Sequence, residues 1–168
     1  VLAVWPGYEK ILGHRQALDF DDLILKSGQL LTNHSTILAI CHDRWHYLHI
    51  DEYQDTNPAQ YRLAQLLVGP QKNICVVGDT DQSIYGWRGA DFTNLLHFER
   101  DYPKAKIVLL EENYRSTQTI LTAANAVISK NKQRQDKTLF TKNKDGQKIG
   151  LFTSLDENGE AGFAAKKS

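Results

Sequence analysis

The amino-acid sequence predicts an α/β fold in which a parallel β-sheet is flanked by helices. Short apolar runs alternate along the chain with segments of helical character, in the order strand then helix, repeated three times. The apolar runs are continuous, which is typical of strands buried on both faces of a parallel sheet. Acidic residues follow each run, and such sheets bind ligands at the carboxyl ends of their strands. The candidate chemistry is therefore expected at one edge of the sheet.

The first half of the chain contains the first predicted strand and its helices. Residues 1–45 are expected to be helical, because apolar residues recur at near-helical spacing and Asp19 suits a helix start. An apolar run at 47–50 predicts the first strand. Asn57 and Pro58 then suit the cap and the first position of the next helix.

Two more predicted strands follow, each with its helix. Residues 73–78 contain a β-branched run that predicts a central parallel strand, and the polar residues 79–89 predict a loop. Residues 91–101 are expected to form a helix, residues 107–110 a third buried strand, and residues 116–129 a further helix. Beyond this point the pattern is weak.

Composition narrows the class of protein. The chain has 168 residues, 41% of them hydrophobic, and a net charge of zero, so any DNA binding has to come from local patches. No apolar stretch approaches the roughly 20 residues that cross a bilayer. Cys41 and Cys75 have no paired spacing, which fits a reducing compartment and a cytoplasmic protein. Cys75 lies in an apolar run and is expected to be buried. The chain contains no Met, so we expect that it does not begin where translation begins.

The first chemical motif is the pair Asp51-Glu52 at the end of the first predicted strand. A carboxylate at a strand tip can hold Mg²⁺, because this ion keeps most of its waters and takes one or two protein carboxylates. The adjacent carboxylate points elsewhere and can orient or deprotonate an attacking water. The bare dipeptide is a weak signal, but the full string from His49 to Thr56 is far more specific.

The second motif is the loop from Gly78 to Asp91. It begins at a strand end, so Asp79 and Gln82 are expected to reach the same site as Asp51. A glutamine amide both accepts from water and donates to a phosphate oxygen, which makes Gln82 a candidate sensor of the terminal phosphate.

The same loop carries the aromatic residues Tyr85 and Trp87 beside Arg88. Two aromatic rings and a guanidinium in a polar loop are typical of a platform on which single-stranded bases stack. The alternative is that both rings pack onto the body of the domain.

The third motif runs from Glu111 to Thr117 and joins a strand to a helix. Arg115 can reach a phosphate from there, and Tyr114 can stack on a nucleobase. The alternative is an ordinary helix start, with Ser116 as the cap and Arg115 paired to Glu111 or to the adjacent Glu112.

Together the three strings resemble motifs II, III and IV of the UvrD/Rep/PcrA-like superfamily 1 helicases, in the same order and spacing. They read Asp-Glu-Tyr-Gln-Asp-Thr, then Gly-Asp-Thr-Asp-Gln-Ser-Ile-Tyr-Gly-Trp-Arg-Gly-Ala-Asp, then Asn-Tyr-Arg-Ser-Thr. The segment 18–24 is similar to the one that precedes motif II in this family. The resemblance covers about residues 16–144, and it implies RecA-like (P-loop NTPase) domains that bind ATP and Mg²⁺.

The resemblance also implies residue roles at the nucleotide. Asp51 would act on Mg²⁺ and Glu52 would be the catalytic base. Gln82 would contact the γ-phosphate region, Arg115 would act as the arginine finger, and Tyr114 would stack on adenine.

The implied partners are single-stranded DNA and junctions with duplex DNA, along which the family translocates 3′ to 5′. The implied DNA contacts are Phe20, Tyr85, Trp87 and Arg88.

The sequence departs from the family in containing no Gly-x-x-x-x-Gly-Lys-[Ser/Thr] loop to cradle the phosphates. We therefore expect a fragment that is inactive by itself. Residues 1–15 would end an inserted helical subdomain, residues 16–108 would form the C-terminal part of a first RecA-like domain, and residues 109–168 would begin a second. Two other interpretations stay open: a truncated module that binds single-stranded DNA without ATPase activity, and part of a RecB/AddA-type helicase–nuclease subunit.

Overall fold

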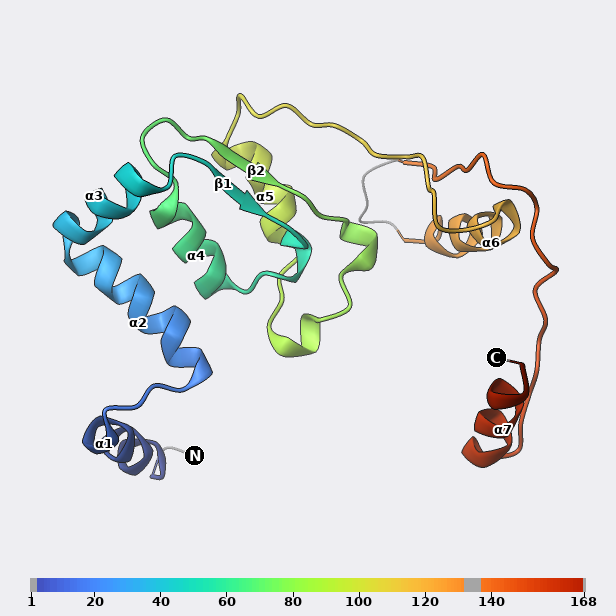
Figure 1. Cartoon of the computed structure of the whole chain (residues 1–168), viewed down its shortest axis with the longest axis horizontal. Coiled ribbons are helices and arrows are strands. Elements are labelled where there is room, and N and C mark those ends of the chain that lie inside the picture. The colour runs from blue at the N-terminus through green and yellow to red at the C-terminus, as the bar shows by residue number, and fades with distance from the viewer. Residues whose placement is uncertain (1–2, 132–136, 168) are drawn as a thin grey trace. The chain divides into compact units, whose positions relative to one another are not determined.

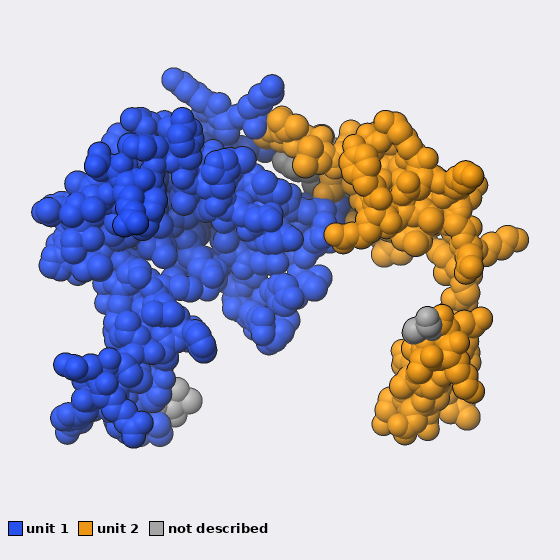
Figure 2. Space-filling model, viewed as in Figure 1, with its two compact units in different colours: residues 1–106 blue, residues 107–168 orange. Residues whose placement is uncertain are grey.

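The computed structural model describes residues 3–131 and 137–167. Parts of the predicted segments 1–15 and 109–168 therefore lie outside the described residues. The chain divides into two compact units, Val1–Lys106 and Ile107–Ser168, which Figure 2 shows in different colours. None of the described helices is both long enough and apolar enough to cross a membrane.

The described residues of unit 1 form a small sheet and five α-helices, which Figure 1 labels. The helices are α1 (Trp5–Arg15), α2 (Phe20–Asn33), α3 (Ser35–Arg44), α4 (Pro58–Leu67) and α5 (Thr93–Asp101).

Two of these helices begin where the sequence predicts a cap. Asp19 accepts from the backbone N–H of Asp22 at 2.8 Å, and Asn57 accepts from that of Gln60 at 2.9 Å. Both form capping boxes, which satisfy backbone donors that a helix start leaves open. The helix α2 packs against α3 and α4, so these starts also set the helical layer of the unit.

The sheet consists of β1 (Leu48–Ile50) and β2 (Ile74–Val76), which pair in parallel with Leu48 opposite Ile74 and Ile50 opposite Val76. This confirms the predicted α/β fold with a parallel sheet. Short 3₁₀ turns follow the strands, at Tyr53–Asp55 after β1 and at Thr80–Gln82 and Gly86–Arg88 after β2.

The core of unit 1 centres on Tyr53, which follows β1 closely in the sequence. This residue is 1% exposed, and its ring lies edge-on to Phe98 of α5 with centroids 6.0 Å apart. The ring of Tyr61 from α4 lies 6.4 Å from that of Tyr53. Helices α4 and α5 therefore anchor the segment that follows the first strand.

Cys75 corrects one expectation, because the thiol is exposed rather than buried. In both strands the outer residues are half-buried and the middle residue is exposed. His49 and Cys75 are register partners, so they lie on the same face of the sheet. A continuous apolar run predicts burial on both faces, whereas this face of the described sheet is open to solvent.

Unit 2 contains α6 (Gln118–Ile128) and α7 (Glu157–Lys167). The predicted third strand at 107–110 is wrong, because these residues are exposed and pair with no strand among those described. An apolar run becomes a strand only where a neighbouring edge accepts its hydrogen bonds. The described residues of this unit contain an isolated bridge between Glu112 and Phe140.

Candidate functional site

Two loops leave the carboxyl edge of the sheet side by side. Asp51 and Glu52 follow β1, and Asp79 follows β2 after Val77 and Gly78. The N–H of Val77 donates to the carbonyl of Ile50 at 2.8 Å, and the N–H of Tyr53 donates back to the carbonyl of Val77 at 2.9 Å. These bonds extend the parallel pairing by one step and hold the two loops together. The predicted convergence of Asp51 and Asp79 at one edge follows from this register.

Glu52 adopts a left-handed backbone conformation with φ of 49°. A non-glycine residue in this region costs about 1–3 kcal/mol and persists only where its surroundings hold it. Its N–H donates to Oδ1 of Asp51 at 2.9 Å. Both carboxylates are exposed, so both are accessible at the tip of the sheet.

A chain of hydrogen bonds joins the two loops through the side chain of Gln54. Its Nε2 donates to Oε2 of Glu52 at 2.8 Å, and its Oε1 accepts from the backbone N–H of Asp79 at 3.0 Å. The Asp79 carboxylate in turn accepts from Nε2 of Gln82 at 2.8 Å and from the N–H of Asp81 at 2.9 Å. The structure thus brings together Glu52, Asp79 and Gln82, which the sequence placed in two separate motifs.

Sequence reasoning did not assign a role to Gln54. It lies inside the first motif string, but nothing in its spacing distinguishes it from a surface residue. In the structure it is 1% exposed. Its place between the Glu52 carboxylate and the backbone of Asp79 becomes visible only in the folded chain.

The carboxylates fit the coordination habits of Mg²⁺. This ion keeps several waters and takes one or two carboxylates together with substrate phosphates. Exposed Asp51 suits that role. Within residues 3–131 and 137–167, no group of three or more His, Cys, Asp or Glu side chains gathers as a closed metal cage would require.

The aromatic loop after β2 projects into solvent. Trp87 is 77% exposed, so its ring does not pack onto the body of the unit. The guanidinium carbon of Arg88 lies 4.8 Å from the Trp87 ring centroid and 5.5 Å from that of Tyr85. Phe20, at the first position of α2, is 90% exposed. These side chains are available for stacking, and their contact with DNA stays a prediction.

In unit 2 the third motif forms a tight loop around Asn113. Its Oδ1 accepts from the N–H of Arg115 at 3.0 Å and from that of Ser116 at 2.7 Å. From the other side, Nδ2 of Asn143 donates to the carbonyls of Tyr114 and Ser116 at 3.3 and 3.1 Å. The side chains of Tyr114 and Arg115 are exposed.

The loop leads directly into α6, as the alternative of an ordinary helix start expects, but two details of that alternative differ. The N-cap of α6 is Thr117 rather than Ser116. Glu112 pairs with Lys142 at 2.9 Å, and no ion pair to Arg115 occurs among the described residues. Hydrogen bonds from Lys142 and from the Tyr114 hydroxyl lower the pKa of Glu112. The hydrogen bond to the Glu112 carboxylate in turn raises the pKa of Tyr114. Tyr114 and Arg115 belong to unit 2, so a nucleotide shared with unit 1 stays a prediction.

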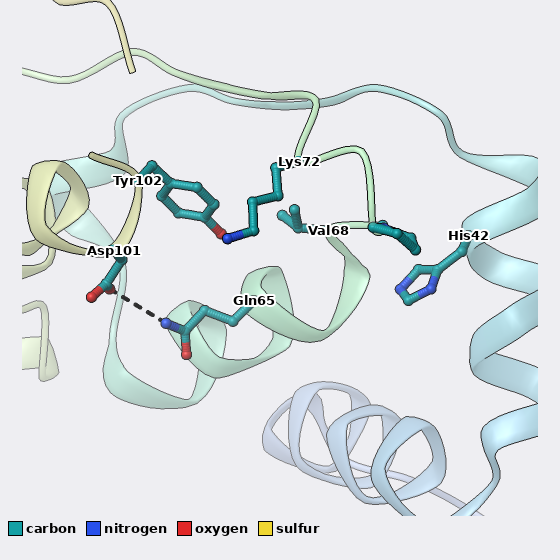
Figure 3. Close-up of a pocket in the computed structure, with 8 residues that line it drawn as sticks. His42, Gln65, Val68, Lys72, Asp101 and Tyr102 are labelled. Atoms are coloured by element: carbon teal, nitrogen blue, oxygen red, sulfur yellow. Dashed lines mark hydrogen bonds between the residues drawn. The ribbon is translucent and has the colours of Figure 1, made fainter. Parts of the chain in front are cut away.

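A pocket lies elsewhere in unit 1 (Figure 3). It has a volume of about 370 Å³ and is lined by His42, Gln65, Val68, Gly69, Pro70, Lys72, Asp101 and Tyr102. Figure 3 shows Gln65 donating to Asp101, a bond of 3.4 Å. Because residues 69–72 precede β2, this pocket lies toward the amino ends of the strands, away from the acidic tips. It contains none of the predicted site residues.

Comparison with known proteins matches both units to helicase families. Residues 1–103 match the family described as UvrD/REP helicase N-terminal domain, and residues 108–167 match the UvrD-like helicase C-terminal domain. The chain is 50% identical over 167 residues to the ATP-dependent DNA helicase PcrA of Staphylococcus aureus strains COL and MW2. It is equally similar to PcrA of Staphylococcus epidermidis. Each match covers 99% of this chain and 23% of the relative, so the chain spans about a quarter of the length of the curated relatives it matches.

Proposed function

The chain belongs to the UvrD/REP helicase family, and from that premise we propose that it forms part of the motor of an ATP-dependent DNA helicase. The whole protein would couple ATP hydrolysis to 3′ to 5′ translocation on single-stranded DNA and to unwinding at junctions with duplex DNA. The observation that carries the proposal is the hydrogen-bonded chain that joins Glu52, Gln54, Asp79 and Gln82 at the carboxyl edge of the sheet.

In this proposal the first unit supplies the magnesium-and-water half of the ATP site. Asp51 would hold Mg²⁺ through its water shell, and the ion would neutralise charge on the phosphates. Glu52 accepts a proton from the attacking water, and Gln82 contacts the γ-phosphate. Exposure of Asp51 and Glu52 side by side at the strand tip supports these roles. Arg115 and Tyr114 of the second unit would complete the site, as arginine finger and adenine platform.

The proposed domain division places the end of a helical subdomain at 1–15 and the C-terminal part of a first RecA-like domain at 16–108. Residues 109–168 would begin the second RecA-like domain. Along the sequence, the boundary of the compact units falls between Lys106 and Ile107, and the two family matches are separated by residues 104–107. Both boundaries support a division close to the proposed one.

The open face of the sheet supports a place within a larger fold. Parallel sheets are covered on both faces, yet the middle residues His49 and Cys75 of the two strands are exposed here. In the proposal, parts of the first RecA-like domain that come from elsewhere in the whole protein cover this face.

The proposed path of DNA runs over the loop of Tyr85, Trp87 and Arg88 and past Phe20. Each base stacked on an aromatic side chain is worth about 1–3 kcal/mol without sequence preference. The exposed Trp87 ring, with the Arg88 guanidinium over it, supports this assignment.

The proposal is tested in the full-length helicase by replacing Glu52 with Gln. Loss of a general base should lower kcat for ATP hydrolysis by about 10²- to 10⁴-fold, while the affinity for single-stranded DNA is retained. A Glu52→Gln enzyme with wild-type kcat would refute the proposed base.

A second test uses the 168-residue chain alone. It should show no ATP hydrolysis, because its own residues include no loop of the Gly-x-x-x-x-Gly-Lys-[Ser/Thr] type to hold the triphosphate. Hydrolysis by the pure chain that disappears in its Glu52→Gln variant would contradict this.

A further inference from the structure

The side chain of Gln54 hydrogen-bonds to both acidic loops and is almost completely buried. We propose that Gln54 is a positioning residue, which holds the Glu52 carboxylate in place and makes its orientation depend on the loop that begins at Asp79. This inference rests on the proposed function, in which Glu52 is the catalytic base. Gln54 itself lies behind the site and acts through Glu52.

The argument starts from the two ends of one planar amide. Nε2 donates to Glu52 at 2.8 Å while Oε1 accepts from the N–H of Asp79 at 3.0 Å. The side chain is 1% exposed, so water has little access to replace either partner. Reversing the amide would set oxygen against the Glu52 carboxylate and NH₂ against the Asp79 N–H. Only one orientation therefore satisfies both neighbours.

The oxygen end of the amide also lies close to Gly78. A Cβ at this position would lie 2.9 Å from Oε1 of Gln54 and 3.3 Å from Cδ2 of Leu95. The absence of a side chain at Gly78 thus leaves room for the amide oxygen. Both ends of the amide are held by hydrogen bonds, and the oxygen end occupies space that a side chain at Gly78 would need.

Glu52 needs such a support because its carboxylate is exposed on a long, flexible side chain. A catalytic group has to stay close to its productive geometry, since a displacement of about 1 Å can cost about 10²-fold in rate. A hydrogen bond from the buried Gln54 connects this carboxylate to the interior of unit 1.

The same amide links Glu52 to the phosphate-sensing loop. Asp79 binds Gln54 through its backbone and Gln82 through its carboxylate, at 3.0 and 2.8 Å. A movement of Gln82 toward a phosphate therefore pulls on the Asp79 carboxylate, and the backbone N–H of Asp79 pulls on Oε1 of Gln54. The base is thereby placed according to the state of the loop.

The test compares Gln54→Met with Asn94→Leu in the full-length helicase. Met keeps the length of the side chain and removes both hydrogen bonds. Asn94 is a matched control, because its buried amide donates to the carbonyl and hydroxyl of Thr56 at 3.0 and 3.2 Å, at the far end of the loop after β1, rather than to the Glu52 carboxylate. Melting temperature, kcat and KM for ATP, and affinity for single-stranded DNA are measured for both.

We expect Gln54→Met to lower kcat by about tenfold or more with KM for ATP changed by less than about twofold, since the base is displaced but binding groups remain. Asn94→Leu should have a lower melting temperature and an unchanged kcat. Wild-type kcat in Gln54→Met, or an equal loss of kcat in Asn94→Leu, overturns the inference.

Two further variants complete the design. Gly78→Ala pushes on the same amide from the other side and reports on it even if Gln54→Met does not fold. It should lower kcat in the wild type and cause no further loss in the Gln54→Met background; additive losses would overturn the shared route. Glu52→Gln, measured in parallel, separates the two proposals. If it retains kcat, the proposed function fails, and if only Gln54→Met retains kcat, the positioning role alone fails.

Discussion

Replacement of Gly78 by Ala offers a direct measurement of how tightly the two acidic loops are packed. The new Cβ would lie 2.9 Å from Oε1 of Gln54 and 3.4 Å from its backbone nitrogen. The first distance is about half an ångström shorter than an ordinary carbon–oxygen contact. Gly78 has no left-handed φ, so the backbone itself accepts Ala and the collision alone decides the outcome.

The size of the effect follows from what has to yield. Overpacking of a filled core costs about 1–3 kcal/mol. If the amide rotates away instead, it loses hydrogen bonds to Asp79 and Glu52, worth about 0.5–1.5 kcal/mol for the neutral one and more for the one to a carboxylate. Either route lowers the free energy of unfolding by about 1–3 kcal/mol, a large share of the roughly 5–15 kcal/mol of a typical domain.

Urea unfolding of the 168-residue chain, followed by tryptophan fluorescence, measures this change. The matched control is Gly28→Ala, because a Cβ there meets nothing within 4 Å inside α2. In a helix interior Ala should stabilise by about 0.5–1 kcal/mol relative to Gly. The reasoning fails if Gly78→Ala is as stable as the wild type while Gly28→Ala shows its expected gain.

Three other predictions concern burial and loop structure. Burial raises the pKa of Tyr53 to about 12, so the neutral phenol contributes its full stabilisation below pH about 10 and loses it as the pH rises toward 12. Between these pH values the free energy of unfolding of Tyr53→Phe should therefore fall by about 1–3 kcal/mol less than that of the wild type, as alkaline unfolding experiments would measure. Cys75 should react faster with a neutral thiol reagent in the isolated chain than in the full-length helicase, as mass spectrometry of the labelled peptide would show, and equal rates would contradict a covered sheet face. Asn113→Ala should lower kcat of the full-length enzyme, because the loop that carries Arg115 loses both bonds to the Asn113 oxygen; unchanged kcat would show that this loop needs no such support.

Much of the fold could be predicted because its signals are local. Asn57 and Pro58 predicted the start of α4, where the structure has a capping box and proline in the first turn. The parallel pairing of the strands followed from continuous apolar runs separated by a helix, and it places Asp51 and Asp79 at one edge. A cap or a strand-to-helix order depends on neighbours within a few residues, which the sequence displays directly.

Burial could not be predicted in the same way, because it depends on what lies across from a residue. The run at 107–110 looks like a buried strand, yet it is exposed and pairs with no strand in the described part of the chain. Cys75 looks like a core thiol, yet the face of the sheet on which it lies is open.

By itself, the sequence determined the family of this chain and the two acidic tips, since motif strings and strand periodicity are written in consecutive residues. Only the tertiary structure decided what connects the tips. Gln54 bonds to Glu52, two positions away, and to Asp79, twenty-five positions away. The second partner exists only because β1 and β2 pair in one particular register, and a hydrogen bond of that kind depends on distances that no local pattern encodes.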